Sequence, residues 1–271
     1  MILGLEYAFM RHAVFAGSAI ALVSAPMGYL VLLRRQAFAA HALSHVGFAG
    51  AAGALLLSLS PYLGLFAFTL ASAVGLALLG SRVSERDVGI GMVLMFALGL
   101  GVLFLNLYTA NAAAAIGILF GSIVGISGAQ AWLSAGVALG VLAVLALIYR
   151  PLRLASLDQD AALGRGVPVG ALGVVFVLLL ALTVSISVPV IGALLIFSLL
   201  IGPPAAARML ARSVEGGLLL AALIGLAETW SGIAASYYIG YPASTWIAGI
   251  SFLVYLAAVW GGPWLRPGAP R

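Results

Sequence analysis

Long apolar stretches separated by short polar ones fill the chain between residues 13 and 261. A bilayer has ~30 Å of hydrocarbon, and an α-helix needs about 20 mostly apolar residues to cross it. The pattern therefore predicts an all-α, polytopic bundle of about nine transmembrane helices, forming a single membrane domain over residues 1–271. The expected spans are Ala13–Leu33, Gln36–Leu59, Tyr62–Gly80, Val88–Tyr108, Ala131–Tyr149, Val169–Ser187, Val190–Ala207, Gly216–Ile239 and Thr245–Gly261.

Two segments leave the number of crossings open between eight and ten. The apolar segment Ile116–Ile126 is too short to span a bilayer and contains two glycines, so we expect a re-entrant or interfacial piece. The span Val190–Ala207 is also short, follows its predecessor at Ser187-Val188-Pro189 with almost no loop, and contains Gly202-Pro203-Pro204. We expect those prolines to break the hydrogen-bond ladder of the helix.

Composition agrees with a membrane protein and limits its chemistry. Hydrophobic residues make up 64% of the chain and charged residues only 7%. Cysteine is absent from the sequence, which excludes disulfides and thiolate metal ligands. Lysine is absent too, so the chain has no Walker A phosphate-binding loop. Any use of ATP must therefore come from a separate partner, and the chain itself is not expected to be an enzyme.

The arginines test the layout independently of hydropathy. When the loops are assigned alternately to the two sides of the membrane, eleven of the twelve arginines fall on one side and only Arg11 on the other. The positive-inside rule makes the arginine-rich side cytoplasmic. We therefore predict a multi-pass protein of the cell membrane with its N-terminus outside and its C-terminus in the cytoplasm.

Two of the three histidines, His41 and His45, stand four residues apart in the second span. On a helix this spacing places both imidazoles on one face, about one turn apart. Neutral imidazoles at that spacing can hold a divalent metal ion. Two other readings fit the same spacing: core histidines bonded to neighbouring carbonyls, or a protonatable pair at the membrane surface.

Glu228 is a carboxylate placed at membrane depth, in the eighth span. A charge there costs at least ~2.5–3.5 kcal/mol on insertion scales, so such residues normally face a polar interior. We favour a functional group that faces a polar cavity over a protonated, hydrogen-bonded structural role. Glu228 would complete a site with the histidines if the eighth span packs beside the second.

The longest polar stretch, Arg150–Pro168, includes a short helix-compatible run, Gln159–Leu163. Asp158 suits the N-terminal position of that helix. Composition alone also fits a solvated connector.

Three segments resemble the membrane subunits of zinc and manganese ABC importers. Arg34-Arg35 followed by His41–His45 (HALSH) resembles the RRMS…DALSH segment of that family. The second segment, Val190–Arg208, resembles the family pattern VGALLVxALLIxPAATAR. The third, Ser236–Ser244, resembles the pattern SYxxDxPxG, and the three segments occur in the family's order.

The resemblance implies a permease that dimerises, receives its metal from an extracytoplasmic binding protein and is driven by a cytoplasmic ABC ATPase. It implies a metal or translocation site at His41, Ser44 and His45, the positions of the DALSH segment. It also implies that the loop around Asp158, Gln159, Asp160 and Arg165, similar to the family's DxExAxxxGV, docks on the ATPase. The metal is substrate, and no resident cofactor or nucleic acid is expected.

The chain departs from the family pattern in ways that bear on the metal. His41 stands where the family has aspartate, and Gly240 and Ser244 stand where its C-terminal segment has aspartate and glycine. Exchanging a carboxylate for an imidazole should favour zinc-like ions over manganese. We expect zinc as the metal first, then manganese or iron. Two alternatives remain: an ABC permease for a metal chelate or small compound, and a self-sufficient proton-coupled secondary transporter.

Overall fold

The computed structural model describes residues 6–78, 83–108, 117, 121, 123, 125–193 and 195–265. This part of the chain is helical and contains no strand. Its helices are α1 (Ala8–Leu33), α2 (Ala37–Leu56), α3 (Pro61–Leu78), α4 (Val83–Leu107), α6 (Gly128–Leu157), α7 (Gln159–Gly164), α8 (Val169–Ile191), α9 (Ile196–Leu210), α10 (Val214–Ile239) and α11 (Ala243–Leu265). The predicted all-α bundle is confirmed.

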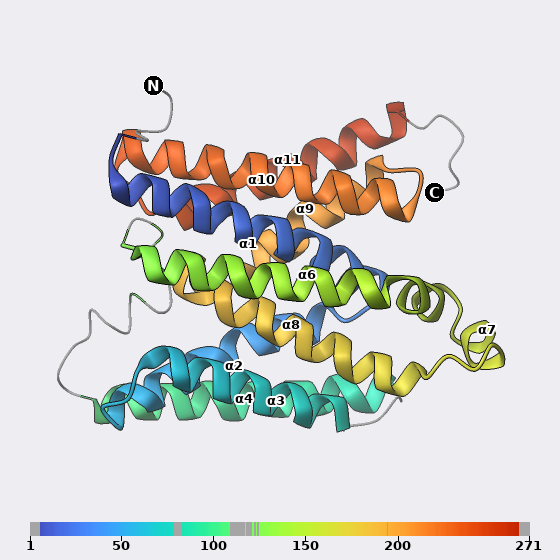
Figure 1. The fold of residues 1–271 in the computed structure, drawn as a ribbon, viewed down its shortest axis with the longest axis horizontal. Helices are drawn as coiled ribbons and strands as arrows, with labels where there is room; N and C mark the ends of the chain where they lie inside the picture. Colours follow the sequence, from blue (N-terminus) through green and yellow to red (C-terminus); the bar gives the residue numbers. More distant parts are fainter. Residues whose placement is uncertain are drawn as a thin grey trace.

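Eight of these helices are long and apolar enough to cross a membrane, and α9, with 15 residues, is shorter. In Figure 1, α8 ends on the left and α10 begins on the right, so the segment that contains α9 returns the chain across the bundle. Helix α1 begins on the left and α11 ends on the right. Over the described residues, the eight long helices and the shorter α9 therefore agree with the predicted nine crossings.

Several predicted boundaries are wrong, mostly at prolines. Helix α6 does not end at Arg150-Pro151 but continues to Leu157, and α8 continues through Pro189 to Ile191. The seventh span therefore begins at Ile196 and not at Val190, after a turn at Gly192, whose φ is 101°. Helix α9 also runs unbroken through Pro203 and Pro204. A proline removes a single backbone donor, and buried membrane helices tolerate this loss because neighbouring helices hold them in place.

The ends of other helices differ by only a few residues from the prediction. Helix α1 begins at Ala8, five positions before the predicted start, and α2 ends at Leu56. Helix α6 begins with a capping box in which Ser127 and Gln130 satisfy each other's backbone donors. The expected re-entrant piece, Ile116–Ile126, falls mostly outside the described residues.

The helices pack in two groups joined by α8. Helix α2 lies against α3 and α4, whereas α1 lies against α6, α9 and α10, and α11 covers α9 and α10. Close packing of α2 on α3 depends on glycines, because a Cβ at Gly50 would overlap the Gly64 carbonyl and a Cβ at Gly64 would overlap the Gly50 carbonyl. This contact fixes α2, which carries the histidines.

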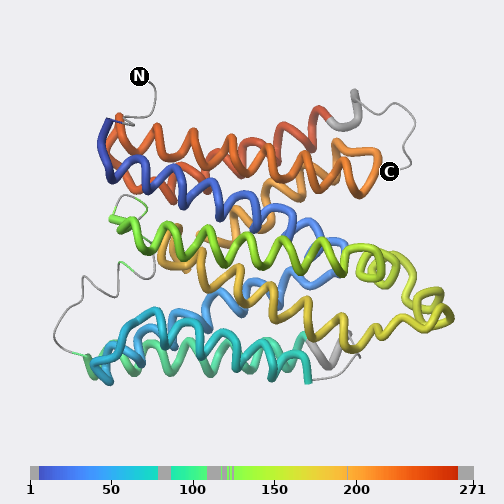
Figure 2. The backbone as a smooth tube through the Cα atoms, viewed as in Figure 1, coloured from blue at the N-terminus to red at the C-terminus, as the bar shows by residue number. Residues whose placement is uncertain are grey.

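Helix α7 stands apart from the bundle. Figure 2 shows it at the right-hand end, where the chain turns from α6 back into α8. The α1–α2 turn with Arg34 and Arg35 lies at the same end, which we call the arginine-rich end.

Candidate functional site

His41 and His45 face each other on α2. Their ring centroids are 4.6 Å apart and the rings meet edge to face. His45 is buried, with 8% of its surface exposed, and His41 is partly buried. The ring of Phe197, from α9, lies 4.9 Å from His41. The predicted pairing of the two imidazoles on one helix face is therefore confirmed, and α9 closes one side of it.

The polar atoms around the pair leave a ring nitrogen available. Nδ1 of His41 is buried and has no hydrogen-bond partner among the described residues. Ser44, by contrast, donates its hydroxyl proton to the Ala40 carbonyl of its own helix at 3.0 Å. Its oxygen keeps lone pairs, but a neutral hydroxyl is not among the usual protein ligands of zinc and an imidazole nitrogen is, so the imidazoles are the better metal ligands of this segment.

The described residues of one chain do not supply a complete metal site. In the described part of the chain, no three His, Cys, Asp or Glu side chains lie close enough together to hold a metal ion. Two imidazoles alone fall short of the four ligands of a closed zinc site. The pair can contribute to a metal site only with further ligands, such as water or a second subunit.

Glu228 lies in a different part of the bundle. Its side chain is 1% exposed, and neither carboxylate oxygen accepts a well-formed hydrogen bond among the described residues, although the Ser251 hydroxyl of α11 lies beside the carboxylate. Its helix, α10, packs on α1, α9 and α11 and makes no extensive contact with α2. Glu228 would complete the histidine site only if the eighth span packed beside the second. Within one subunit, this packing does not occur.

The predicted docking residues lie together on and around α7. Asp158 caps the helix, its carboxylate accepting the Ala161 N–H at 2.9 Å, as its sequence position predicted. Gln159 and Asp160 occupy the first turn, and Arg165 follows the last. All four side chains are exposed to solvent. The short helix is therefore confirmed, and its polar face is free for a partner.

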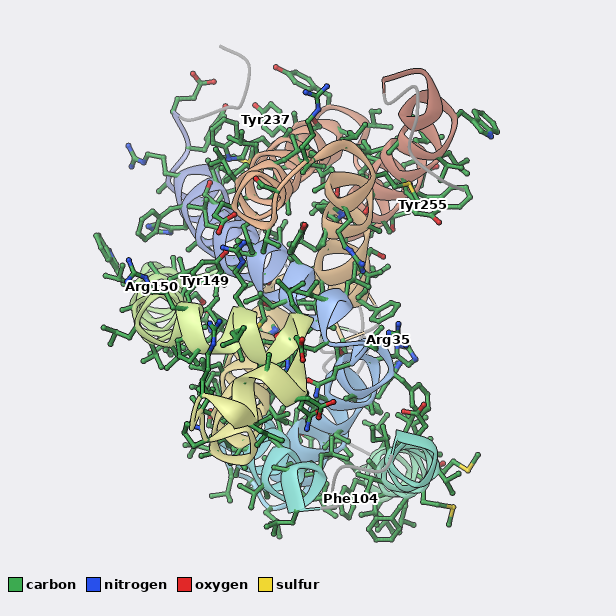
Figure 3. All side chains as sticks on the ribbon, turned by 90° about the vertical axis from the view of Figure 1, so that its right-hand side faces the viewer. Arg35, Phe104, Tyr149, Arg150, Tyr237 and Tyr255 are labelled. Carbon is green, nitrogen blue, oxygen red and sulfur yellow. The ribbon has the colours of Figure 1, made fainter. Side chains whose placement is uncertain are left out.

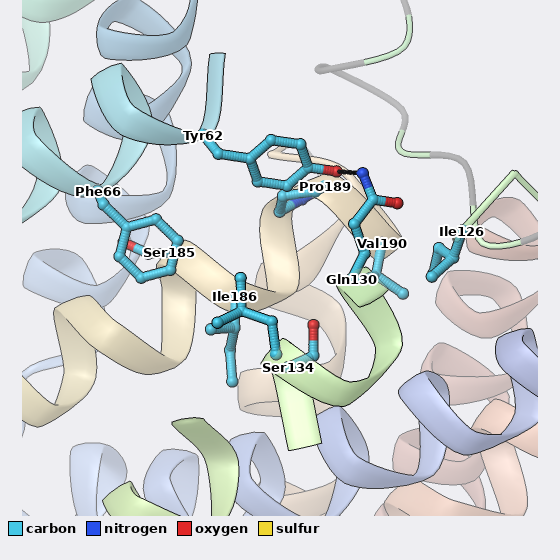
Figure 4. A pocket seen from close by; sticks show the side chains of 10 residues that line it. Tyr62, Phe66, Ile126, Gln130, Ser134, Ser185, Ile186, Pro189 and Val190 are labelled. Atoms are coloured by element: carbon cyan, nitrogen blue, oxygen red, sulfur yellow. Dashed lines mark hydrogen bonds between the residues drawn. The ribbon is translucent and has the colours of Figure 1, made fainter. Parts of the chain in front are cut away.

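A small pocket lies away from these residues, between α3, α6 and α8 (Figure 4). Its cavity volume is only about 20 Å³, roughly the room that one water molecule needs. At its mouth the Gln130 amide donates to the Tyr62 hydroxyl at 2.6 Å, and the buried Ser185 hydroxyl has no hydrogen-bond partner in the described structure. Its lining is mostly apolar and comes from three helices, so no sequence motif could have indicated it.

Sequence comparison places the chain in a known family. A sequence model described as the ABC 3 transport family matches residues 6–262. The chain belongs to the ABC 3 transport family. The resemblance that the three segments carry is thereby confirmed.

Similar proteins match most of the chain. The manganese import system permease protein ScaB of Streptococcus gordonii is 26% identical over 259 residues, 95% of this chain and 93% of the relative. The manganese transport system membrane protein MntC of Halalkalibacterium halodurans is 29% identical over 231 residues, 84% of this chain and 79% of the relative. Both names describe membrane components of transport systems.

A solved structure has the same fold. PsaBC from Streptococcus pneumoniae, in complex with Fab, contains a chain that matches with a TM-score of 0.86 and 23% identity. The match covers 97% of this chain and 95% of that one. The helical arrangement of Figure 1 is therefore a fold already seen in a solved structure.

Proposed function

We propose that this protein is the membrane subunit of an ATP-driven, binding-protein-dependent importer of a divalent metal ion. The observation that carries the proposal is the paired arrangement of His41 and His45, with a free ring nitrogen, on a helix inside the bundle of an ABC 3 family member. Imidazole suits zinc, whereas the relatives named above are manganese systems. Zinc and manganese are therefore the first candidates for the substrate, followed by iron.

The incomplete coordination fits transport. An ion held by two protein ligands per subunit can be released, whereas a closed four-ligand site would retain it. We propose a homodimer in which the two-fold axis brings a second histidine pair to the first, so that up to four imidazoles surround the path. Because the chain has no cysteine, a single His45→Cys substitution would report this proximity by crosslinking between subunits.

The ends of the bundle have different partners in this proposal. The arginine-rich end faces the cytoplasm by the positive-inside rule, and the exposed helix α7 docks there on a separate ABC ATPase. The opposite end receives the metal from an extracytoplasmic binding protein. The absence of a Walker A loop from the sequence supports the need for a separate ATPase.

Metal uptake by the reconstituted transporter tests the proposal. Proteoliposomes with the permease, its ATPase and its binding protein are assayed for ATP-dependent uptake of zinc, manganese, iron and cobalt. We expect uptake of at least one metal, lost in His45→Ala but kept in His12→Ala. His12 is the matched control because it is the third histidine and stands on α1, beside Gly128. Failure of the wild type to take up any of the four metals would refute the proposal.

A further inference from the structure

We propose that Arg34 couples the docking helix α7 to the histidine helix α2. The inference depends on the proposed function, because it assumes that α7 receives movement from an ATPase and that α2 controls the metal path. Arg34 is then a positioning residue: it touches no metal, and acts by tying the start of α2 to the end of α6.

The side chain of Arg34 reaches two other helices. Its Nη1 donates to the hydroxyl oxygen of Ser156 on α6 at 3.2 Å, across 122 positions of sequence. Its guanidinium carbon lies 5.0 Å from the ring centre of Phe176, a fully buried residue of α8. A guanidinium over an aromatic ring in this geometry is a cation–π contact. Arg34 thus holds both helices that flank α7.

Ser156 is well placed to pass on a movement of α7. It lies two residues before Asp158, which ends α6 and caps α7. Its own hydroxyl proton is committed to the Leu152 carbonyl at 2.6 Å, so the oxygen is free to accept from Arg34. A shift of α7 therefore pulls directly on the acceptor of the Arg34 hydrogen bond.

On the other side of Arg34 the chain is short and stiff. Only Arg35 and Gln36 separate it from the first residue of α2. Arg35 has a φ of 55°, in the left-handed region. This backbone conformation is energetically unfavourable for any residue that carries a side chain. The Gln36 N–H bonds back to the Val31 carbonyl at 2.9 Å. Movement of Arg34 therefore reaches α2 about one turn before His41.

Direct helix packing gives α2 little contact with α6. Helix α2 packs mainly on α3 and α4, contacts α8 and α9 less, touches α1 only sparsely, and makes no extensive contact with α6. The α1–α2 turn is therefore a short connection between α6 and the histidine helix, alongside the packing of α8 on α2, and Arg34 makes a polar contact from this turn to α6.

Arg35 provides a matched control. It is the neighbouring arginine, it is exposed, and Figure 3 shows it on the side of the arginine-rich end away from α6 and α7. A change there removes the same charge from the same turn without touching Ser156.

The test uses the full transporter with its ATPase and binding protein in proteoliposomes. We expect Arg34→Gln to keep ATP hydrolysis and ATPase binding but to lower metal uptake per ATP at least tenfold. Ser156→Ala should lower the same ratio less, Arg34→Lys should restore part of it, and Arg35→Gln should match the wild type. An unchanged ratio in both Arg34→Gln and Ser156→Ala, or an equal loss in Arg35→Gln, would overturn the inference.

A second measurement separates this inference from the proposed function. A spin label on Phe38→Cys, at an exposed position of α2 in a cysteine-free chain, reports movement of that helix without any metal. We expect ATP to change the label spectrum or the inter-label distance in the wild-type background and to change neither with Arg34→Gln. A full ATP response in the Arg34→Gln background would refute the coupling role, even if the wild type transports metal.

Discussion

A single methyl group at Gly28 should loosen α1 from α9. Because Pro204 has no N–H, the Leu200 carbonyl lacks its usual partner within α9, and Gly28 of α1 packs directly against that carbonyl. A Cβ at position 28 would overlap the Leu200 carbonyl oxygen and lie 3.0 Å from the Pro204 ring. The obstacle is backbone, so either the two helices separate or one of them bends.

The expected size follows from two opposing effects. Replacing a helical glycine by alanine gains up to ~1 kcal/mol of helix propensity. Forcing an extra carbon into a closely packed contact costs about 1–3 kcal/mol. We therefore expect Gly28→Ala to lower the free energy of unfolding by up to ~2 kcal/mol. Gly140 on α6 has nothing within 4 Å of its Cβ position, so Gly140→Ala should be neutral or slightly stabilising.

The two variants are compared by denaturant-dependent unfolding in detergent micelles, followed by tryptophan fluorescence. Because α9 also carries Phe197, which contacts His41, Gly28→Ala should also reduce metal uptake. If Gly28→Ala is as stable as Gly140→Ala, the close approach of α1 to the Leu200 carbonyl is not a packing constraint and the reasoning is refuted.

Three further substitutions probe the site and the docking helix. His41→Asp should keep uptake but raise the ratio of manganese to zinc transported, measured by paired isotope uptake, because a carboxylate suits manganese better than an imidazole does; an unchanged ratio would exclude His41 from the metal's surroundings. Glu228→Gln keeps the shape of the buried side chain, and Glu228 does not lie beside the histidines, so metal uptake should fall less than in His45→Ala. An equal fall in uptake would place Glu228 on the metal path. Asp158→Ala removes the cap of α7, a loss of about 1 kcal/mol, and should weaken ATPase co-purification without affecting membrane insertion; normal co-purification would argue against docking at α7.

The sequence predicts the helices well and their ends less well. Apolar length identifies each span because the bilayer imposes it, and the arginine distribution supports the order of crossings. The errors at Arg150-Pro151, Pro189 and Pro203-Pro204 have one cause: in each case a helix continues through proline, because packing outweighs the loss of one hydrogen bond. Local sequence does not contain that packing.

The candidate site was predictable only in part. The spacing of His41 and His45 predicted their shared face, and the family resemblance pointed to the same segment. Contacts between distant segments were not predictable, since neither Phe197 beside His41 nor Ser156 beside Arg34 has a local signal. The position of Glu228 depended on which helices are neighbours, and the fold separates it from the pair.

X-ray absorption at the zinc edge tests most directly whether the histidine pair contacts the transported ion. The permease with its ATPase is loaded with zinc, and the spectrum of the wild type is compared with those of the His41→Ala, His45→Ala double variant and the His12→Ala control. We predict imidazole nitrogen at about 2.0–2.1 Å in the wild type and the control. The double variant should lose this imidazole signal. The same imidazole signal in all three proteins would contradict the assignment of the metal path to His41 and His45.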